Sequence, residues 1–214
     1  MNNAEMPPPA RYKLSFVVGQ LLRREALITV PIFLQTQDWK KTKEQITADH
    51  LFQHRTASSE RRFLAEVIKR LSTLSLAELE YFSQASVTEQ GYLLWLAACR
   101  QYRFIAEFAE EVIREKFLIM SPELTHTDFD VFVSGKAGWH PELTEITDAT
   151  MKKLRQNLFK MIEEAELTVN GRIEQCLFSW ELEKILNAKT PSEIRLFPAF
   201  SSDSVVLKTR EKKK

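Results

Sequence analysis

The stretch TEQGYLLWLAACRQYRFIAEFAEEVIREKFLI, residues 88–119, decides the fold class. Large apolar side chains recur along it at the period of an α-helix that buries one broad face. They are Trp95, Leu96, Cys99, Phe104, Ile105, Phe108, Val112 and Ile113. We therefore expect the stretch to form the central helix of the core or a kinked pair of helices. The chain has only five glycines among 214 residues, which disfavours a turn-rich β-fold and favours helices.

Helical signals also run through the N-terminal part of the chain. Residues 14–30 predict a helix that ends before Pro31, because proline disfavours helical geometry in the preceding residue. A short helix over about 38–49 is expected to start at Asp38, whose side chain suits a helix cap. The next helix begins near Ser58 and carries a regular apolar stripe, formed by Phe63, Leu64, Val67, Ile68, Leu71 and Leu74. Two S-x-x-E sequences predict capping boxes that start two further helices, at residues 75–78 and 86–89.

The C-terminal part combines short helices with a hairpin. Ser121-Pro122 and the sequence HPEL, 140–143, each predict a helix start, and a longer helix follows from Met151 to about Glu166. In LTVNGRI, 167–173, Asn170-Gly171 stands between strand-favouring residues, which is typical of a type I′ hairpin. Residues 190–193 fit either a capping box or a turn. The predicted fold class is all-α: a globular multi-helix fold with two helix-turn-helix-like units, the second with a short β-hairpin wing.

The first helix-turn-helix candidate pairs the helix near 38–49 with the helix that begins near Ser58. The start of this second helix is basic and rich in hydroxyls, and the unpaired N–H groups of a helix start favour phosphate. The candidate DNA contacts are Arg55, Thr56, Ser58, Ser59, Arg61 and Arg62. The intervening segment is longer than a minimal turn, and Glu60 adds a negative charge. An ordinary capped helix with solvated basic residues is the alternative.

The second candidate has the order helix, turn, helix and hairpin that is typical of a winged helix. The sequence PELTEI predicts the short helix, TDAT the turn, and the helix from Met151 the recognition helix, with the hairpin as the wing. The candidate DNA contacts are Lys152, Lys153, Arg155, Gln156 and Lys160 on the polar side of the helix, and Arg172 at the tip of the hairpin. Winged helices also serve purely in protein contacts, so that alternative stays open.

The formal net charge of +1 hides a segregation along the chain. Residues 1–70 carry 12 Lys and Arg against 7 Asp and Glu, whereas residues 71–150 carry 5 against 13 and residues 151–214 carry 13 against 9. The basic terminal thirds suggest that a polyanion or an acidic partner binds them, with the acidic middle as scaffold. Chance fluctuation of charge along the chain is the alternative.

No motif for catalysis is found in the sequence: it has no glycine-rich phosphate loop, zinc-protease motif or nucleophile elbow. His126 and His140, with two aspartates nearby, are interpreted as solvated loop residues and not as a metal site. The glutamates at 107, 110, 111 and 115 are interpreted as a solvated helix face. We therefore expect no enzyme activity, no catalytic residue, no cofactor and no metal. Cys99 and Cys176 stand alone and are expected to be buried thiols.

Membrane insertion is not expected. The longest uncharged run of the apolar N-terminal region, residues 26–37, is shorter than the roughly 20 apolar residues that a spanning helix needs. The first residues, MNNAEMPPPARYK, lack the pattern of a secretory signal. We therefore expect a cytoplasmic protein.

Six blocks of the sequence together resemble the BrxA family of bacteriophage-exclusion (BREX) systems. They are YKLSFVVGQLLRREALI (12–28), RTASSERRFLAEVIKRLSTLS (55–75), LLWLAACRQYRFIAEFAEEVIREKF (93–117), DFDVF (128–132), WHPEL (139–143) and KLRQNLFKMIEEAEL (153–167). The resemblance runs from about Tyr12 to Phe197. It implies an all-helical fold with helix-turn-helix elements, binding to double-stranded DNA, and work alongside the methyltransferase and other BREX proteins. The family has also been labelled an inner-membrane protein, which the short apolar runs of this chain contradict.

We divide the chain into five parts. They are a disordered N-terminal segment (1–11), an N-terminal helical region with the first helix-turn-helix candidate (12–75), a central helical scaffold (76–138), a C-terminal winged-helix-like region (139–200) and a basic tail (201–214). The leading hypothesis is a non-enzymatic, double-stranded-DNA-binding core component of a BREX phage-defence system. The alternative is an adaptor that scaffolds other defence components without touching DNA, and RNA binding is a third possibility.

Overall fold

The central stretch forms two helices in the computed structural model, which describes residues 10–16, 18 and 20–200. Helix α5 (Val87–Gln101) ends at Tyr102, whose backbone is extended, with φ −126° and ψ 98°. Helix α6 (Arg103–Phe108) then continues through a π-helical turn, η1 (Ala109–Arg114), into α7 (Glu115–Leu118). Of the two predicted alternatives, one central helix or a kinked pair, the structure shows the kinked pair. Trp95 is fully buried on α5, and its indole N–H donates to the Leu196 carbonyl over 2.9 Å.

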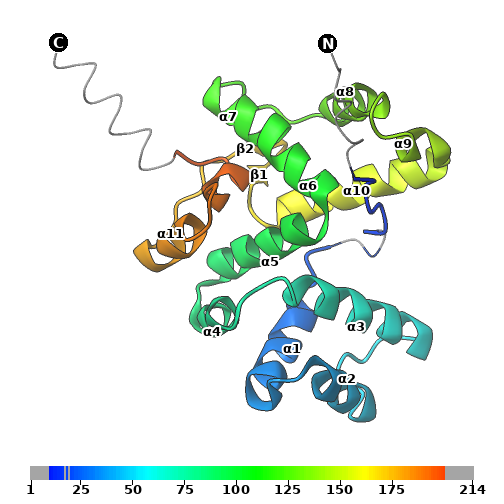
Figure 1. Cartoon of the computed structure of the whole chain (residues 1–214), viewed down its shortest axis with the longest axis vertical. Coiled ribbons are helices and arrows are strands. Elements are labelled where there is room, and N and C mark those ends of the chain that lie inside the picture. The colour runs from blue at the N-terminus through cyan, green and yellow to red at the C-terminus, as the bar shows by residue number, and fades with distance from the viewer. Residues whose placement is uncertain (1–9, 17, 19, 201–214) are drawn as a thin grey trace, which may run out of the picture.

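The helices of the N-terminal part lie at one end of the molecule (Figure 1). They are α1 (Arg23–Thr36), α2 (Trp39–Ala48), α3 (Ala57–Leu71) and α4 (Leu76–Gln84). The predicted cap at Asp38 is confirmed, since its carboxylate accepts the N–H groups of Lys40 and Lys41. Helix α3 begins slightly earlier than expected, because the Thr56 hydroxyl caps it by accepting the N–H of Ser59.

The prediction of a helix over 14–30 is wrong at both ends. Helix α1 begins only at Arg23, because the carbonyls of Phe16, Val18 and Gln20 accept hydrogen bonds from side chains of α3 and α10 instead of from a following helical turn. At the other end α1 runs through Pro31. Pro31 lies on the exposed side of α1, where the missing N–H costs least.

The two predicted capping boxes have different outcomes. At Ser75 the box is complete, since the hydroxyl accepts the N–H of Glu78 and the Glu78 carboxylate accepts the N–H of Ser75. At Ser86 only the hydroxyl half forms. The carboxylate of Glu89 instead accepts the hydroxyl of Tyr81 and the N–H of Ser179, so it ties α5 to α4 and to the start of the last α-helix.

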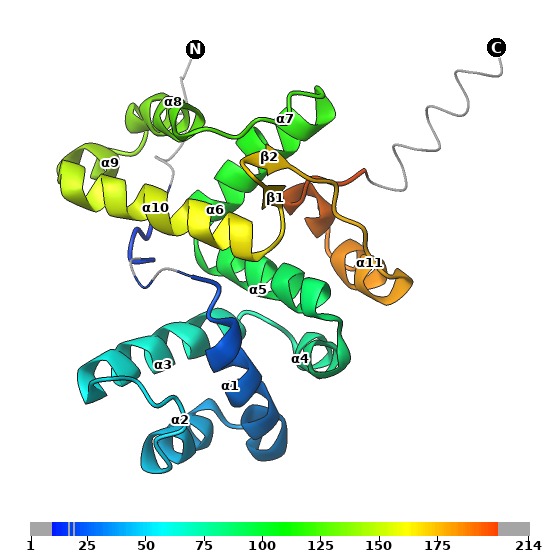
Figure 2. The same cartoon turned by 180° about the vertical axis from the view of Figure 1, so that it is seen from behind.

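The C-terminal part wraps the other side of α5 and α6 (Figure 2). Its elements are α8 (His126–Ala137), α9 (Glu142–Glu145), α10 (Asp148–Glu164), β1 (Thr168–Val169), β2 (Arg172–Ile173), α11 (Trp180–Asn187) and the 3-10 helix η2 (Glu193–Leu196). The predicted hairpin is confirmed, and both turn residues, Asn170 at φ 52° and Gly171 at φ 76°, have the positive φ that a type I′ turn requires. At 190–193 the chain bends, and the helix that follows, η2, is capped by Ser192 and not by Thr190, because the Ser192 hydroxyl accepts the N–H of Ile194.

The predicted helix start at Ser121-Pro122 is wrong. Residues 122–124 run along the hairpin: Ile173 donates its N–H to the Pro122 carbonyl over 2.7 Å, and Leu124 donates to the Gly171 carbonyl over 2.8 Å. Thr125 caps α8 instead, in a capping box with Asp128. The hairpin is thus supported by a third extended segment, which fixes it against the rest of the chain.

Cys99 and Cys176 are free and buried, as predicted, and burial raises the pKa of both thiols, that of Cys176 to about 12. The prediction that His140 is solvated is wrong: it is buried and stacks on Tyr12 with ring centroids 3.7 Å apart.

Among the described residues, no cluster of His, Cys, Asp or Glu could hold a metal ion, and none of the helices has both the length and the hydrophobicity that crossing a membrane requires. The first nine residues of the segment predicted as disordered (1–11) and the predicted basic tail (201–214) lie outside the described residues.

Candidate nucleic-acid interface

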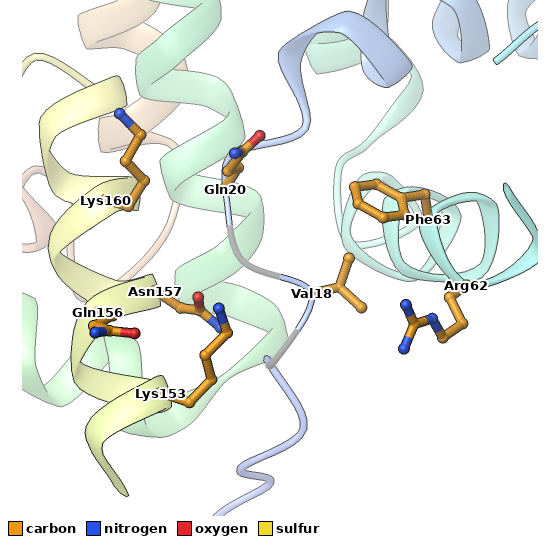
Figure 3. A pocket seen from close by; sticks show the side chains of 8 residues that line it. All are labelled: Val18, Gln20, Arg62, Phe63, Lys153, Gln156, Asn157 and Lys160. Carbon is orange, nitrogen blue, oxygen red and sulfur yellow. The ribbon is translucent and has the colours of Figure 1, made fainter. Parts of the chain in front are cut away.

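Basic side chains of the two candidate recognition helices, α3 and α10, meet at one groove. It lies between α3 and α10 and has a volume of about 660 Å³. Its lining residues are Val18, Gln20, Arg62, Phe63, Lys153, Gln156, Asn157 and Lys160. Figure 3 shows the side chains of α10 on one side, Arg62 and Phe63 of α3 on the other, and Val18 and Gln20 between them. Four predicted site residues, Arg62, Lys153, Gln156 and Lys160, are therefore brought together from two helices.

Both helices begin at the same side of the molecule, as Figures 1 and 2 show. Each start has a hydroxyl cap: Thr56 for α3 and Thr147 for α10, which accepts the N–H of Thr150. The positive ends of the two helix dipoles therefore lie on one side of the groove. Helix dipoles with this arrangement favour a negatively charged ligand.

Val18 and Gln20 form the floor of the groove, and two buried side chains hold this part of the chain. The Arg70 guanidinium of α3 donates to the carbonyls of Gln20 at 2.6 Å and Val18 at 2.9 Å, and to the Glu66 carboxylate at 2.7 Å. From the other side, the Asn157 amide of α10 donates to the Phe16 carbonyl over 3.1 Å. Because both helices bind the same segment, the distance between α3 and α10 is fixed by these hydrogen bonds.

We expect Arg70→Lys to destabilise the fold by about 2–3 kcal/mol, because one ammonium cannot replace the three directed bonds of a buried guanidinium. Urea unfolding would measure this change. The matched control is Arg61→Lys, the same substitution on the exposed face of α3, which should leave stability within about 0.5 kcal/mol. If both variants unfold at the wild-type urea concentration, Arg70 does not hold the floor.

Positive charge in the groove is left largely uncompensated. Arg62 and Lys153 are exposed, and neither makes an ion pair with a carboxylate of the described residues. Lys160 has only a weak, exposed partner, Glu163, at 3.5 Å. Glu60 adds a negative charge near the start of α3, but it is only 8% exposed and its carboxylate lies 3.7 Å from the His50 ring. The lining therefore presents cations to solvent and keeps the nearest acid of α3 inside.

The remaining predicted contacts lie outside the groove lining. Arg55, Ser58, Arg61 and Lys152 are exposed beside it. The Thr56 and Ser59 hydroxyls already bond each other in the cap of α3.

Two basic residues that looked equivalent in the sequence are paired with acids. The Arg155 guanidinium reaches both carboxylate oxygens of Asp130 on α8, each at 2.8 Å, so it points away from the groove. Arg172 is exposed on the hairpin with Glu123 at 3.5 Å. Their ion pairs make both weaker candidates for DNA contact than Arg62 and Lys153.

Sequence reasoning missed the residues that shape the groove. Val18 and Gln20 were assigned to a helix, and Phe63 was counted only as core. Asn157 lies among polar residues of α10 with no signal that sets it apart. Their role depends on contacts between segments that are far apart in the chain.

Comparison with known proteins gives consistent results. A family model described as BrxA matches residues 10–190. Over 147 residues the chain is 25% identical to the BREX protein BrxA of Escherichia coli O9:H4 (strain HS), a match that covers 69% of each protein. It is also 25% identical over 132 residues to the BREX protein BrxA of Bacillus cereus (strain H3081.97), covering 62% of this chain and 66% of that protein.

A solved structure shares the fold. The crystal structure of an uncharacterized protein from Magnetospirillum magneticum superposes with a TM-score of 0.73 at 18% identity, covering 88% of this chain and 98% of that one. Because the family model spans most of the sequence, the family assignment does not rest on this fold likeness alone. The chain belongs to the BrxA family of BREX proteins.

Proposed function

We propose that this BREX protein is a non-enzymatic component of phage defence that binds double-stranded DNA in the groove between α3 and α10. The observation that carries the proposal is the convergence of Arg62, Lys153 and Lys160 on one solvent-open groove between two helices that begin at the same side of the molecule. Arginine and lysine at such positions bind the DNA backbone, and the helix dipoles add to the attraction. The protein then acts on DNA together with other BREX proteins, including the methyltransferase, and is therefore cytoplasmic.

We assign separate roles to the side chains of the groove. Arg62, Lys153 and Lys160 contact phosphates, whereas Gln156, whose amide both donates and accepts hydrogen bonds, reaches toward base edges. Arg55, Ser58, Arg61 and Lys152 extend the contact with the backbone on either side. Arg172 on the hairpin contacts a phosphate farther along the duplex. The lining offers cations, amides and apolar groups, which suit binding, and no nucleophile paired with a base.

Salt dependence tests the proposal directly. With about 4–6 phosphate contacts, the slope of log affinity against log salt concentration is expected to be about −4 to −5. Fluorescence anisotropy of a labelled duplex, measured at several salt concentrations with the full-length protein, gives this slope. No binding at low salt would refute the proposal. Stronger competition by RNA than by duplex DNA would support RNA as the ligand instead.

An adaptor function is the second candidate, and one observation favours it. Several large apolar side chains at the α7 and α8 end of the molecule are exposed to solvent, which is typical of protein contact sites. The two functions are compatible, because the apolar side chains lie at the α7 and α8 end whereas the basic groove lies between α3 and α10. Co-purification with other BREX proteins after nuclease treatment would show contacts that do not depend on DNA.

A further inference from the structure

A second groove, of about 580 Å³, lies between α7 and α8, at the end of the molecule opposite α1 and α2 (Figure 1). Its apolar lining includes Ile119, Val131 and Trp139, and Trp139 is 73% exposed. Leu118 and Met120, on either side of Ile119, are also exposed. Burying such side chains against a partner would remove a large apolar area from water.

The wall formed by α8 contains a notch. Val131, Gly135 and Trp139 follow one another at intervals of four residues, so they lie on one face of the helix and its end. A Cβ atom added to Gly135 would meet no atom of the described residues within 4 Å. The backbone of Gly135 is not in a conformation that needs glycine, because its φ is not positive. The glycine thus leaves an open space on the helix surface between Val131 and Trp139, two large exposed apolar residues.

The charges around the groove are unequally exposed. Lys136 bonds both Glu107 and Glu111, and its side chain is 20% exposed, against 47% for that of Glu111. Lys116 is held by Asp128 at 2.6 Å. Glu115 lies outside the groove lining, one helical turn before Ile119; it is exposed, and no ion pair compensates it within the described part of the chain. Both lysines of the lining are therefore paired with carboxylates, and Glu107 also pairs with Arg103. Because the lysines are less exposed than Glu111, the most exposed charges beside the groove, Glu111 and Glu115, are negative.

We propose that the groove between α7 and α8 is a docking surface for a partner protein, and that it binds an apolar segment flanked by lysines or arginines. The apolar side chains of the segment pack on Ile119, Val131 and Trp139, and one of them fills the notch at Gly135. The flanking cations pair with Glu111 and Glu115. Charge complementarity selects this occupant, because a duplex or an acidic segment would meet the same carboxylates with like charge.

Binding of a model peptide to the full-length protein tests the surface. The probe is a fluorescently labelled amphipathic peptide of leucine and lysine, compared with the same peptide carrying glutamate in place of each lysine. We expect the lysine peptide to bind at least about tenfold more tightly, as measured by anisotropy at low salt. Equal binding of the two peptides, or no binding of the lysine peptide, would overturn the proposal.

The chain offers a matched pair of variants for locating the site. Gly135→Leu fills the notch and should weaken binding of the lysine peptide at least about tenfold. Gly138→Leu places the same side chain at the end of the same helix, again with no atom of the described residues within 4 Å and outside the groove lining, and should bind like wild type. Both variants should keep the wild-type thermal unfolding midpoint, which separates loss of the site from loss of the fold.

Two other occupants give distinct results. Sedimentation would detect a second copy of this chain as self-association that Gly135→Leu abolishes, and that outcome would overturn the partner proposal. The tail of the chain, residues 201–214, combines Val205–Leu207 with following cations, so it has similar chemistry. If Leu207→Glu strengthens binding of the lysine peptide, the tail is the occupant and the partner proposal is wrong.

Discussion

Replacing Arg62, Lys153 and Lys160 together with glutamate is expected to weaken binding to duplex DNA roughly a hundredfold or more at moderate salt. Each substitution removes a phosphate contact and adds a charge that repels the backbone. The salt dependence should change with the affinity, because each lost contact lowers the log–log slope by about 1. Anisotropy of a labelled duplex at several salt concentrations measures both quantities.

The control for this experiment changes the net charge equally at another place. Lys41, Lys43 and Lys189 are exposed and lie outside the groove lining. Their combined replacement by glutamate should weaken binding only slightly, since exposed charges beyond about 10 Å are screened by salt. Equal losses in the two triple variants would mean that net charge, and not the groove, governs binding. Circular dichroism should show both variants folded, because all six side chains are exposed.

The features predicted from the sequence are those that depend on neighbouring residues. The apolar stripe of 88–119, the complete capping box at Ser75 and the Asn170-Gly171 turn each have a local physical cause, so the sequence contains the whole signal. The kink at Tyr102 was left open between one helix and two, because its extended backbone is not marked by glycine or proline.

The features that sequence reasoning missed depend on contacts between distant residues. Arg70 and Asn157 hold the carbonyls of Phe16, Val18 and Gln20 from helices far along the chain, which delays the start of α1 and forms the floor of the groove. Local propensity favours a helix there, and tertiary hydrogen bonds prevail. The role of Arg155 was also hidden, because its pairing with Asp130 depends on how α8 packs beside α10.

Arg100 provides the strongest test of what holds the central helices together. Its guanidinium, largely buried on α5, donates to both oxygens of Glu78 at 2.6 and 2.8 Å and to both oxygens of Glu193 at 2.6 and 2.8 Å. It also donates to the Thr73 carbonyl over 3.0 Å. One side chain thus joins α5 to the connection before α4, to the start of α4 and to η2.

Arg100→Met is expected to lower the free energy of unfolding by about 3–5 kcal/mol, because it leaves two buried carboxylates close together without their cation. Urea unfolding at neutral pH would measure the loss. The control is Arg103→Met, which removes the exposed pair of Arg103 with Glu107 and should cost at most about 0.5 kcal/mol. A similarly small loss for Arg100→Met would show that the buried pairs contribute little.

Acid should narrow the difference in the free energy of unfolding between wild type and Arg100→Met. Burial alone would raise the pKa of Glu78, but hydrogen bonds from Arg100 and Ser75 outweigh it and hold this pKa below its ordinary value. The stabilisation by ionised Glu78 is therefore complete above the ordinary carboxyl pKa and is lost as the pH falls through the lowered value. Without Arg100 the main cause of the lowered pKa is gone while burial remains, so Glu78 in the variant takes up a proton at a higher pH than in wild type. Once Glu78 is protonated, it no longer repels the carboxylate of Glu193. Unfolding measured from neutral pH down to about pH 4 should show the two stabilities converging, and a constant difference over that range would contradict the assignment.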